Sequence, residues 1–153
     1  MDWLIQAGND IGGINGDEET PLHLAAAFVS FQPAATTIWL IENGANINAQ
    51  GGRFGTTSMM DFLFNRAEER VAESPVAMRA ALDAGYDITL VNHAGNNILH
   101  YAAWVGRSPE LIQLIIDHGA DISVRNDEGD TAYDLALENY YLSDTEIMGI
   151  LKP

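Results

Sequence analysis

The chain has four histidines and no cysteine, so a metal site would have to be built from imidazole and carboxylate groups. Two histidines four residues apart on one helix are the usual helical metal pair. His23, His93, His100 and His118 do not have that spacing. The sequence therefore predicts no metal site, and the absence of cysteine also removes disulfides and thiol nucleophiles.

Carboxylates occur in clusters, at 17–19, at 68–69 and at 127–130. General acid–base catalysis needs a carboxyl group whose pKa is raised in an apolar pocket, whereas these clusters fall in expected turns or on an exposed helix. The 127–130 segment lacks the other ligands of a calcium loop. No glycine-rich loop leads into a lysine, and no G-x-S-x-G motif occurs. We expect no catalytic residue and no cofactor, so an enzyme is the least favoured class.

The charge of the chain is strongly negative, because 22 acidic side chains face 7 basic ones, for a net charge of −15. Phosphate groups are bound through Lys and Arg, so this composition argues against nucleic acid and anionic lipid as ligands. A negative surface instead attracts a basic protein and speeds their encounter. The alternative is that the charge serves solubility alone. No apolar run approaches the ~20 residues of a membrane span, and the lack of cysteine favours a cytoplasmic location.

Helical patterns must position any site, and the clearest of them lies at 95–126. Apolar residues on one face predict a first short helix, and a second such stripe predicts a helix from Pro109 to His118. Ser108 is a favourable N-cap, and proline suits the first helical position. Gly119 follows the last apolar turn, where a left-handed residue ends a helix. The apolar residues are Ile98, Leu99, Ala102, Ala103, Leu111, Ile112, Leu114, Ile115 and Ile116.

This helix-turn-helix unit recurs along the chain. Its closing glycine has counterparts at Gly8, Gly44 and Gly85, so that successive glycines are 36, 41 and 34 residues apart. The opening motif T-P-L-H-L-A-A at 20–26 has a counterpart in N-I-L-H-Y-A-A at 97–103. With its closing G-A-D-I, the unit resembles the ankyrin repeat, whose period is about 33 residues. The resemblance implies an all-α ankyrin-repeat solenoid of stacked units connected by loops or β-turn fingers.

We expect a single domain over residues 1–153, made of a half-repeat, a regular repeat, a divergent repeat, a second regular repeat and a closing repeat. The half-repeat agrees either with a native cap or with a piece of a longer protein. In the divergent repeat, we expect the extra residues to lengthen the first helix and add a loop before Ser74-Pro75. We expect a monomer, or a weak homodimer formed through the open end of the array. In order, the units span 1–15, 16–50, 51–92, 93–126 and 127–153.

The resemblance also gives roles to single residues. The histidine of the T-P-L-H motif is structural in ankyrin repeats, which implies that role for His23 and His100. The two positions after the Ala-Ala pair face the concave groove of such arrays and are usually polar. Here they include large aromatic rings, which with an acidic rim predict a protein-binding surface. The alternative is that shifted helices bury the rings. The candidates are Phe28, Phe64, Trp104 and, just beyond the last pair, Tyr140.

The loop tips between repeats form a second candidate surface, since the same resemblance brings them to one side of the array. Arg53 and Phe54 stand in the tip of the divergent repeat, and Asp127, Glu128 and Asp130 stand in the last tip. An exposed aromatic ring beside charged groups is typical of a protein contact. The alternative is that these tips are solvated loops with no ligand.

These observations together predict a non-catalytic module that binds a partner protein with a basic surface, through the groove and the loop tips. Two narrower alternatives stay open. One is a bacterial immunity protein, because ankyrin-like chains of this size resemble some proteins that neutralise a cognate toxin. The other is a scaffold or regulatory segment of a larger protein.

Overall fold

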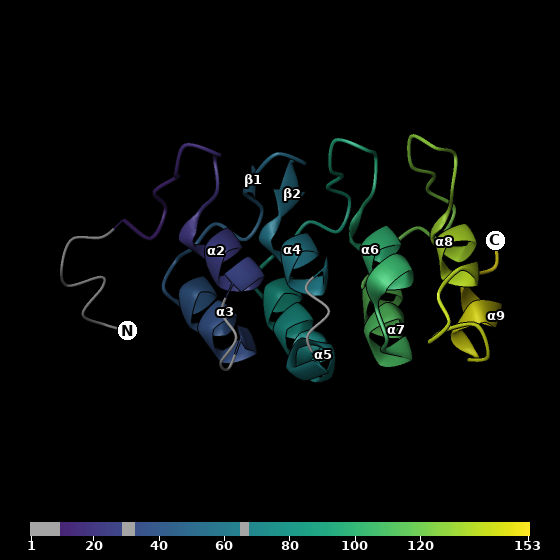
Figure 1. Cartoon of the computed structure of the whole chain (residues 1–153). Helices are drawn as coiled ribbons and strands as arrows, with labels where there is room; N and C mark the ends of the chain where they lie inside the picture. The colour runs from purple at the N-terminus through teal and green to yellow at the C-terminus, as the bar shows by residue number, and fades with distance from the viewer. Residues whose placement is uncertain (1–9, 29–32, 65–67) are drawn as a thin grey trace.

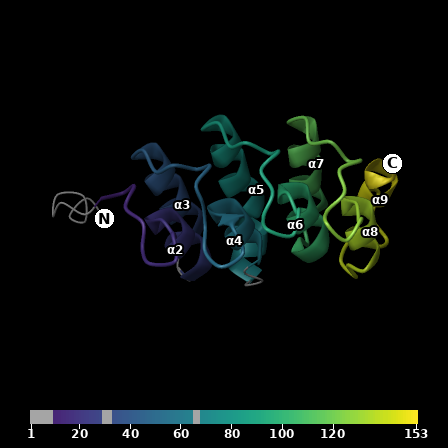
Figure 2. The ribbon, with the colours of Figure 1, turned by 90° about the horizontal axis from the view of Figure 1, so that it is seen from above.

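The computed structural model describes residues 10–28, 33–64 and 68–153. Within these residues, the helices form pairs that stand side by side in a row, as Figure 1 shows. In Figure 2 the first helices of the pairs form one row and the second helices form another, and neighbours within each row pack together. The all-α solenoid is therefore confirmed. The pairs are α2 (Pro21–Phe28) with α3 (Pro33–Glu42), α4 (Ser58–Phe64) with α5 (Glu68–Asp83), α6 (Ile98–Val105) with α7 (Pro109–Asp117), and α8 (Ala132–Leu137) with α9 (Ile147–Leu151).

A loop that we call a finger leads into the first helix of each pair, and the fingers project from one side of the array in Figure 1. The first to fourth fingers are residues 15–20, 50–57, 92–97 and 126–131. The second finger contains β1 (Gln50–Gly51) and β2 (Thr56–Thr57), which pair antiparallel. Most of the expected half-repeat at 1–15 lies outside the described residues.

The predicted helix ends of the third pair are confirmed. The hydroxyl of Ser108 accepts from the amide of Leu111 at 3.2 Å, and Pro109 takes the first position of α7. Gly119, which follows the helix, has a φ of 94°, the left-handed conformation that ends helices at little steric cost to glycine. These local signals fix where the helix starts and stops, so they could be read without knowledge of the packing.

The extra residues of the divergent repeat lengthen its second helix, and the expectation that they lengthen the first is wrong. Helix α4 has only 7 residues, whereas α5 has 16 and contains Pro75 in its interior. An interior proline costs a helix ~3 kcal/mol, but tertiary contacts offset that cost here. Ser74 and Met78 are buried on either side of the proline. The carboxylate of Glu73 accepts from the backbone amide of Ala34 at 2.8 Å, which ties α5 to the start of α3.

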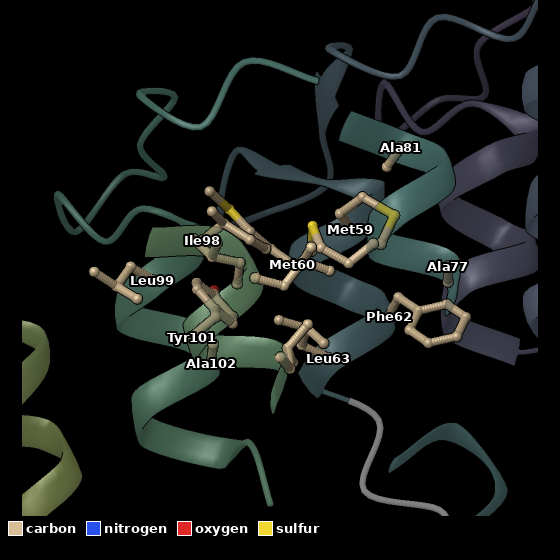
Figure 3. Packing of buried hydrophobic residues seen from close by; sticks show 14 of the residues in the cluster. Met59, Met60, Phe62, Leu63, Ala77, Ala81, Ile98, Leu99, Tyr101 and Ala102 are labelled. Atoms are coloured by element: carbon tan, nitrogen blue, oxygen red, sulfur yellow. The ribbon is translucent and has the colours of Figure 1, made fainter. Parts of the chain in front are cut away.

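In the core of the second pair, the first helix carries the large side chains and the second helix the small ones, which is the reverse of the third pair. Phe62 and Leu63 of α4 stand where α6 has Ala102 and Ala103, and all four are buried. In return α5 presents Ala77 and Ala81, where α7 presents Leu111 and Ile115. Figure 3 shows the α4 side chains directed toward both α5 and α6. Because total volume is conserved, both pairs reach close packing with different residues.

Each histidine of the two regular motifs joins its own helix to the next finger, which confirms the structural role. The Nε2 of His23 donates to the carbonyl oxygen of Thr56 at 3.1 Å, and Nδ1 accepts from the hydroxyl of Thr20 at 2.8 Å. His100 repeats this pattern with the carbonyl of Asp130 at 3.2 Å. Burial is the main cause that lowers the pKa of His100, which favours the neutral form of its imidazole.

We predict opposite effects from removing two adjacent hydroxyls at the start of α4. The hydroxyl of Thr57 bonds the phenol oxygen of buried Tyr86 at 2.9 Å and caps the helix at Met60. Thr57→Ala should lower the unfolding free energy by about 2 kcal/mol, because it leaves the buried phenol unpaired. The buried hydroxyl of Ser58 has no hydrogen-bond partner in the described structure. Ser58→Ala should therefore leave stability unchanged or raise it by up to about 1 kcal/mol. Urea unfolding of the two variants measures both effects, and equal losses would contradict the assignment.

Candidate functional site

Two exposed aromatic rings from neighbouring repeats meet on the surface formed by the first helices and the fingers, which we call the groove face. Phe64 at the end of α4 is 51% exposed and Trp104 near the end of α6 is 44% exposed. Their ring centroids lie 5.8 Å apart, and Tyr101 meets the indole edge-on at 6.3 Å. Contacts with these two rings hold the orientation of the indole. The side chain of Phe28 lies outside the described residues.

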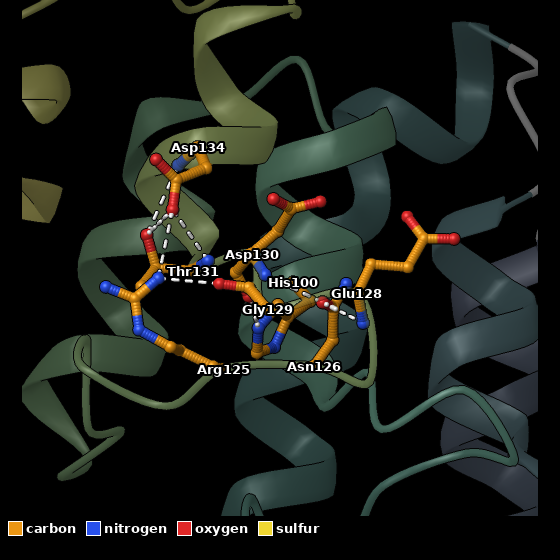
Figure 4. A network of polar contacts seen from close by, with 8 residues as sticks. All are labelled: His100, Arg125, Asn126, Glu128, Gly129, Asp130, Thr131 and Asp134. Atoms are coloured by element: carbon orange, nitrogen blue, oxygen red, sulfur yellow. Dashed lines mark hydrogen bonds and ion pairs between the residues drawn. The ribbon is translucent and has the colours of Figure 1, made fainter.

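A hollow of about 560 Å³ lies beside Trp104, between the third and fourth fingers, and we call it the tryptophan hollow. Its apolar wall includes Trp104 and Leu137, which is 56% exposed. Figure 4 shows the acidic side chains of the fourth finger and of α8, with the Asp134 carboxylate bonded to Thr131. Among the residues that the structure describes, no Lys or Arg lines this hollow, although Arg125 lies 3.8 Å from Asp134. The acidic lining residues are Glu128, Asp130, Asp134 and Glu138.

A second hollow, of about 460 Å³, lies between the first and second fingers, and we call it the phenylalanine hollow. The rings of Phe54 and Phe64 line it, and Phe54 is 61% exposed. Arg53 also lines this hollow, with its guanidinium carbon 5.6 Å from the centroid of the Phe54 ring. The acidic residues Glu19 and Asp61 also line this hollow. The second hollow is therefore lined by one basic and two acidic side chains.

The second finger projects Phe54 because it is two residues longer than the others. Seven positions separate Gln50 from the capping Thr57, whereas five separate the corresponding residues of each other finger. In the third finger, the side chain of Asn92 closes the turn by accepting from two backbone amides at 3.0 Å. Gln50 instead donates to the carbonyls of Gly55 and Val91, and the backbone forms a short hairpin. The extra length places Arg53 and Phe54 at the hairpin tip.

Neighbouring fingers hold the second finger from both sides. The amide of Gly52 donates to the carbonyl of Asp17 at 2.8 Å, and the amide of His93 donates to the carbonyl of Phe54 at 2.9 Å. Gly55 has a φ of 62°, and a side chain there would enter the His93 ring. The finger therefore needs glycine for its conformation and for close contact with the next finger.

Asp61 is a groove-face residue that the sequence reasoning missed. It lies on α4 in the phenylalanine hollow and accepts from the hydroxyl of Thr56 at 2.8 Å. Within the described structure, no Lys or Arg lies within salt-bridge distance of its carboxylate. Desolvation by burial is the main cause that raises the pKa of Asp61. Its place one residue after the motif's histidine position, where the other repeats have Leu24 and Tyr101, was the signal available in the sequence.

The remaining candidates separate into two groups. Glu128 and Asp130 line the tryptophan hollow, whereas the backbone of Asp127 bonds Ala94 of the third finger at 3.1 Å. Tyr140 is 86% exposed but lines neither hollow. It packs edge-on against Tyr141, whose ring also supports the guanidinium of Arg107 at 4.3 Å. The structure thus brings Glu128 and Asp130 to the hollow beside Trp104 and leaves Asp127 and Tyr140 out of the lining of both hollows.

Two family models match the chain: "Ankyrin repeats (many copies)" over residues 82–136 and "Ankyrin repeat" over residues 17–52. The chain belongs to the ankyrin repeat family. Ankyrin repeats are generally protein–protein interaction modules, and the family is typically non-catalytic. In the described part of this array, no group of three or more His, Asp or Glu side chains is placed to hold a metal ion. None of the described helices is long and apolar enough to cross a membrane.

Similar proteins come from different settings. The chain is 28% identical to a homolog of transient receptor potential cation channel subfamily A member 1 from Caenorhabditis elegans, over 91% of this chain and 13% of that protein. It is 26% identical to putative ankyrin repeat protein FPV031 of fowlpox virus, over 97% of this chain and 42% of that protein. A 53-residue stretch is 36% identical to alpha-latroinsectotoxin-Lt1a of Latrodectus tredecimguttatus, over 35% of this chain and 4% of that protein. The chain spans less than half the length of each of these relatives.

We predict that Gly55→Ala disrupts the finger contacts of this ankyrin array. Alanine in the left-handed conformation costs about 1–2 kcal/mol, and its methyl group would also displace His93. Gly16→Ala is the matched control in the first finger, because nothing lies within 4 Å of a methyl group there. Chemical denaturation should show a loss of at least about 1 kcal/mol for Gly55→Ala and no loss for Gly16→Ala. Equal stability of the two variants would show that the second finger is not held as described.

We predict that Asp61→Asn raises the unfolding free energy at neutral pH. Because the pKa of Asp61 is raised in the folded state, the folded protein binds this proton more tightly than the unfolded chain. The carboxyl group therefore lowers stability as pH rises through its folded pKa. Asparagine can still accept from Thr56 and carries no charge.

The measurement is urea unfolding of wild type and Asp61→Asn from pH 4 to pH 8. The stability advantage of the variant should be small at the acidic end and grow with pH. Asp87→Asn is the control, and it should lower the unfolding free energy where Asp61→Asn raises it. The reason is that hydrogen bonds from Thr89 lower the pKa of the exposed Asp87. An advantage of Asp61→Asn that does not change with pH would contradict the charge argument.

Proposed function

We propose that this ankyrin array binds a partner protein through its groove face. The observation that carries the proposal is the contact between the exposed rings of Phe64 and Trp104. Rings that meet across two repeats form a continuous apolar surface larger than either side chain alone. Large aromatic side chains in such positions are typical energetic centres of protein interfaces. Acidic residues around both hollows supply the polar rim that such interfaces have.

We further propose that the partner surface is basic. The chain has a net charge of −15, and four carboxylates line the tryptophan hollow. Only one ion pair, between Arg125 and Asp134, is found in the described residues, and both side chains are partly exposed. The described residues thus leave most of the acidic groups around the hollow without a cationic partner, and a basic partner protein would gain from pairing with them.

The proposed role is non-catalytic. His23 and His100 are buried, and both of their ring nitrogens bond to groups that hold the array together. None of the four carboxylate residues that line the tryptophan hollow is buried. An immunity protein and a scaffold segment are both compatible with such a binding face, and they remain proposals. A cytoplasmic location and a monomer or weak homodimer likewise remain predictions from the sequence.

The test is capture of partners with the immobilised full chain, followed by affinity measurement with the purified partner. Replacing both groove rings, in Phe64→Ala/Trp104→Ala, should weaken binding at least tenfold, because such anchors contribute about 2 kcal/mol or more each. Raising the salt concentration should weaken wild-type binding through charge screening.

The matched control replaces two exposed apolar side chains on the second helices, in Val76→Ala/Ile150→Ala. Ile150 is 43% exposed and Val76 is 59% exposed, so this variant removes exposed apolar groups outside the groove face. This variant should bind like wild type. A partner that binds all three proteins equally would place the interface elsewhere, and salt-independent binding would contradict a basic partner.

A further inference from the structure

We infer that the two hollows bind two different side chains of one partner segment, an arginine beside Trp104 and a large apolar side chain beside Phe54. This inference rests on the proposed function and specifies the ligand at the same face. The two hollows differ in charge, although both contain an aromatic wall. Their occupants therefore differ in chemistry.

The tryptophan hollow suits a cation that is planar. The indole of Trp104 is partly exposed, and contacts with Phe64 and Tyr101 set its orientation before any ligand arrives. The cation–π interaction is stronger over the face of an indole than over the ring of Tyr or Phe. Four carboxylates, from the fourth finger, from α8 and from Glu138 just after it, line the same hollow, and no Lys or Arg is among its described lining residues. A guanidinium can stack on the ring and bond a carboxylate at its edge at the same time, whereas an ammonium is a compact, strongly hydrated charge.

The phenylalanine hollow suits an apolar side chain. Phe54, Phe64 and Ala27 supply its apolar lining. Arg53 already occupies the edge of this hollow, close to the Phe54 ring and in the same lining as Glu19 and Asp61. A cationic side chain of the partner would be repelled by Arg53, so it would bind more weakly here than in the tryptophan hollow. An aromatic or long aliphatic side chain instead removes both exposed phenylalanine rings from water.

The spacing of the two side chains follows from the repeat geometry. The phenylalanine hollow lies between the first and second fingers, and the tryptophan hollow lies between the third and fourth. Two repeat steps therefore separate them, and packed helices are roughly 8–10 Å apart, which gives roughly 16–20 Å. An extended segment covers this distance in about five or six residues at ~3.3 Å each. The Phe64–Trp104 contact lies along the path between the hollows.

A second copy of this chain does not fit the tryptophan hollow well. Each copy would bring the same net charge of −15 to the contact. Like charges across an interface oppose association. A basic segment of a different protein is therefore the occupant to which the charges point.

The experiment is selection of a random 12-residue peptide display library on the full chain and on three variants. Wild type should enrich peptides with Arg and a large apolar residue five or six positions apart. Trp104→Ala should lose the preference for Arg and retain the apolar preference, and Phe54→Ala should do the reverse. Ile150→Ala, which removes an exposed side chain away from the groove face, should give the wild-type pattern.

The strongest peptide is then synthesised with Arg, Lys or citrulline, which has nearly the shape of arginine without its charge. Citrulline should weaken binding about tenfold or more, with Lys between the two. The difference between Arg and citrulline should shrink in Asp130→Asn/Glu138→Gln. Equal binding of the Arg and citrulline peptides would overturn the arginine assignment, as would an Arg preference that survives Trp104→Ala.

The outcomes separate this inference from the proposed function. Peptides that depend on Phe54 or Trp104 but lack the predicted pair, or show it at another spacing, would overturn the two-hollow inference and leave groove binding intact. Peptides that bind all four proteins equally would contradict groove binding as well. No enrichment at all would count against the inference, while partner capture would still decide the proposed function.

Discussion

The bond between each repeat and the next finger is the interaction on which the structure depends. Helices of five to ten residues, as most are here, do not form in isolation because nucleation outweighs so few hydrogen bonds. Stacking supplies the missing free energy, and the fingers fix its register. His23 and His100 reach the backbone of the following finger, and finger amides bond the preceding finger from Gly52 to Asp17, from His93 to Phe54 and from Asp127 to Ala94. The array is thus held at two levels, by packed helices and by this series of finger contacts.

The finger contacts also explain why the groove face can carry unusual residues. Side chains directed between the helix rows must fill the core, as the exchange of Phe62 against Ala77 shows. Groove-face positions carry no such constraint, because the fingers are fixed by their backbone and glycines. A two-residue extension could therefore be added to the second finger without loss of the contact to His93. The same rigidity holds Phe54 in place before binding, which lowers the entropy cost of using it as a contact.

Local signals made part of this structure predictable from sequence. The caps at Ser108 and Gly119 involve only neighbouring residues, so their geometry follows from residue type. The exposure of Phe64 and Trp104 followed from the position of both rings in the repeat pattern. Helix α5 did not follow, because the proline signal at Pro75 is local whereas the contacts that override it come from α3 and α7.

The parts of the site that were missed have the same cause. In the sequence, Asp61 is one more acidic residue. The fold places it in the phenylalanine hollow, where it accepts from the hydroxyl of Thr56 in the second finger. The difference between the two hollows depends on Arg53, which the sequence marked only as a loop contact. Both hollows are lined by residues of two repeats brought together by stacking, so residue spacing within one repeat does not show what shares a hollow with Asp61 or Arg53.

The acidity of the groove face has an energetic consequence for the whole array. Four carboxylates line the tryptophan hollow, and only Asp134 among them is found beside an arginine in the described residues. Self-repulsion from a net charge far from zero lowers the stability of a compact state. The array tolerates this repulsion because its stability comes from stacking on the other side of the helices and from the finger contacts. A bound cation would relieve the repulsion as well as add its own contacts, so binding and stability are thermodynamically linked at this face. If the partner is basic, the charge is therefore more than a solubility device, because pairing with the partner would lower this self-repulsion.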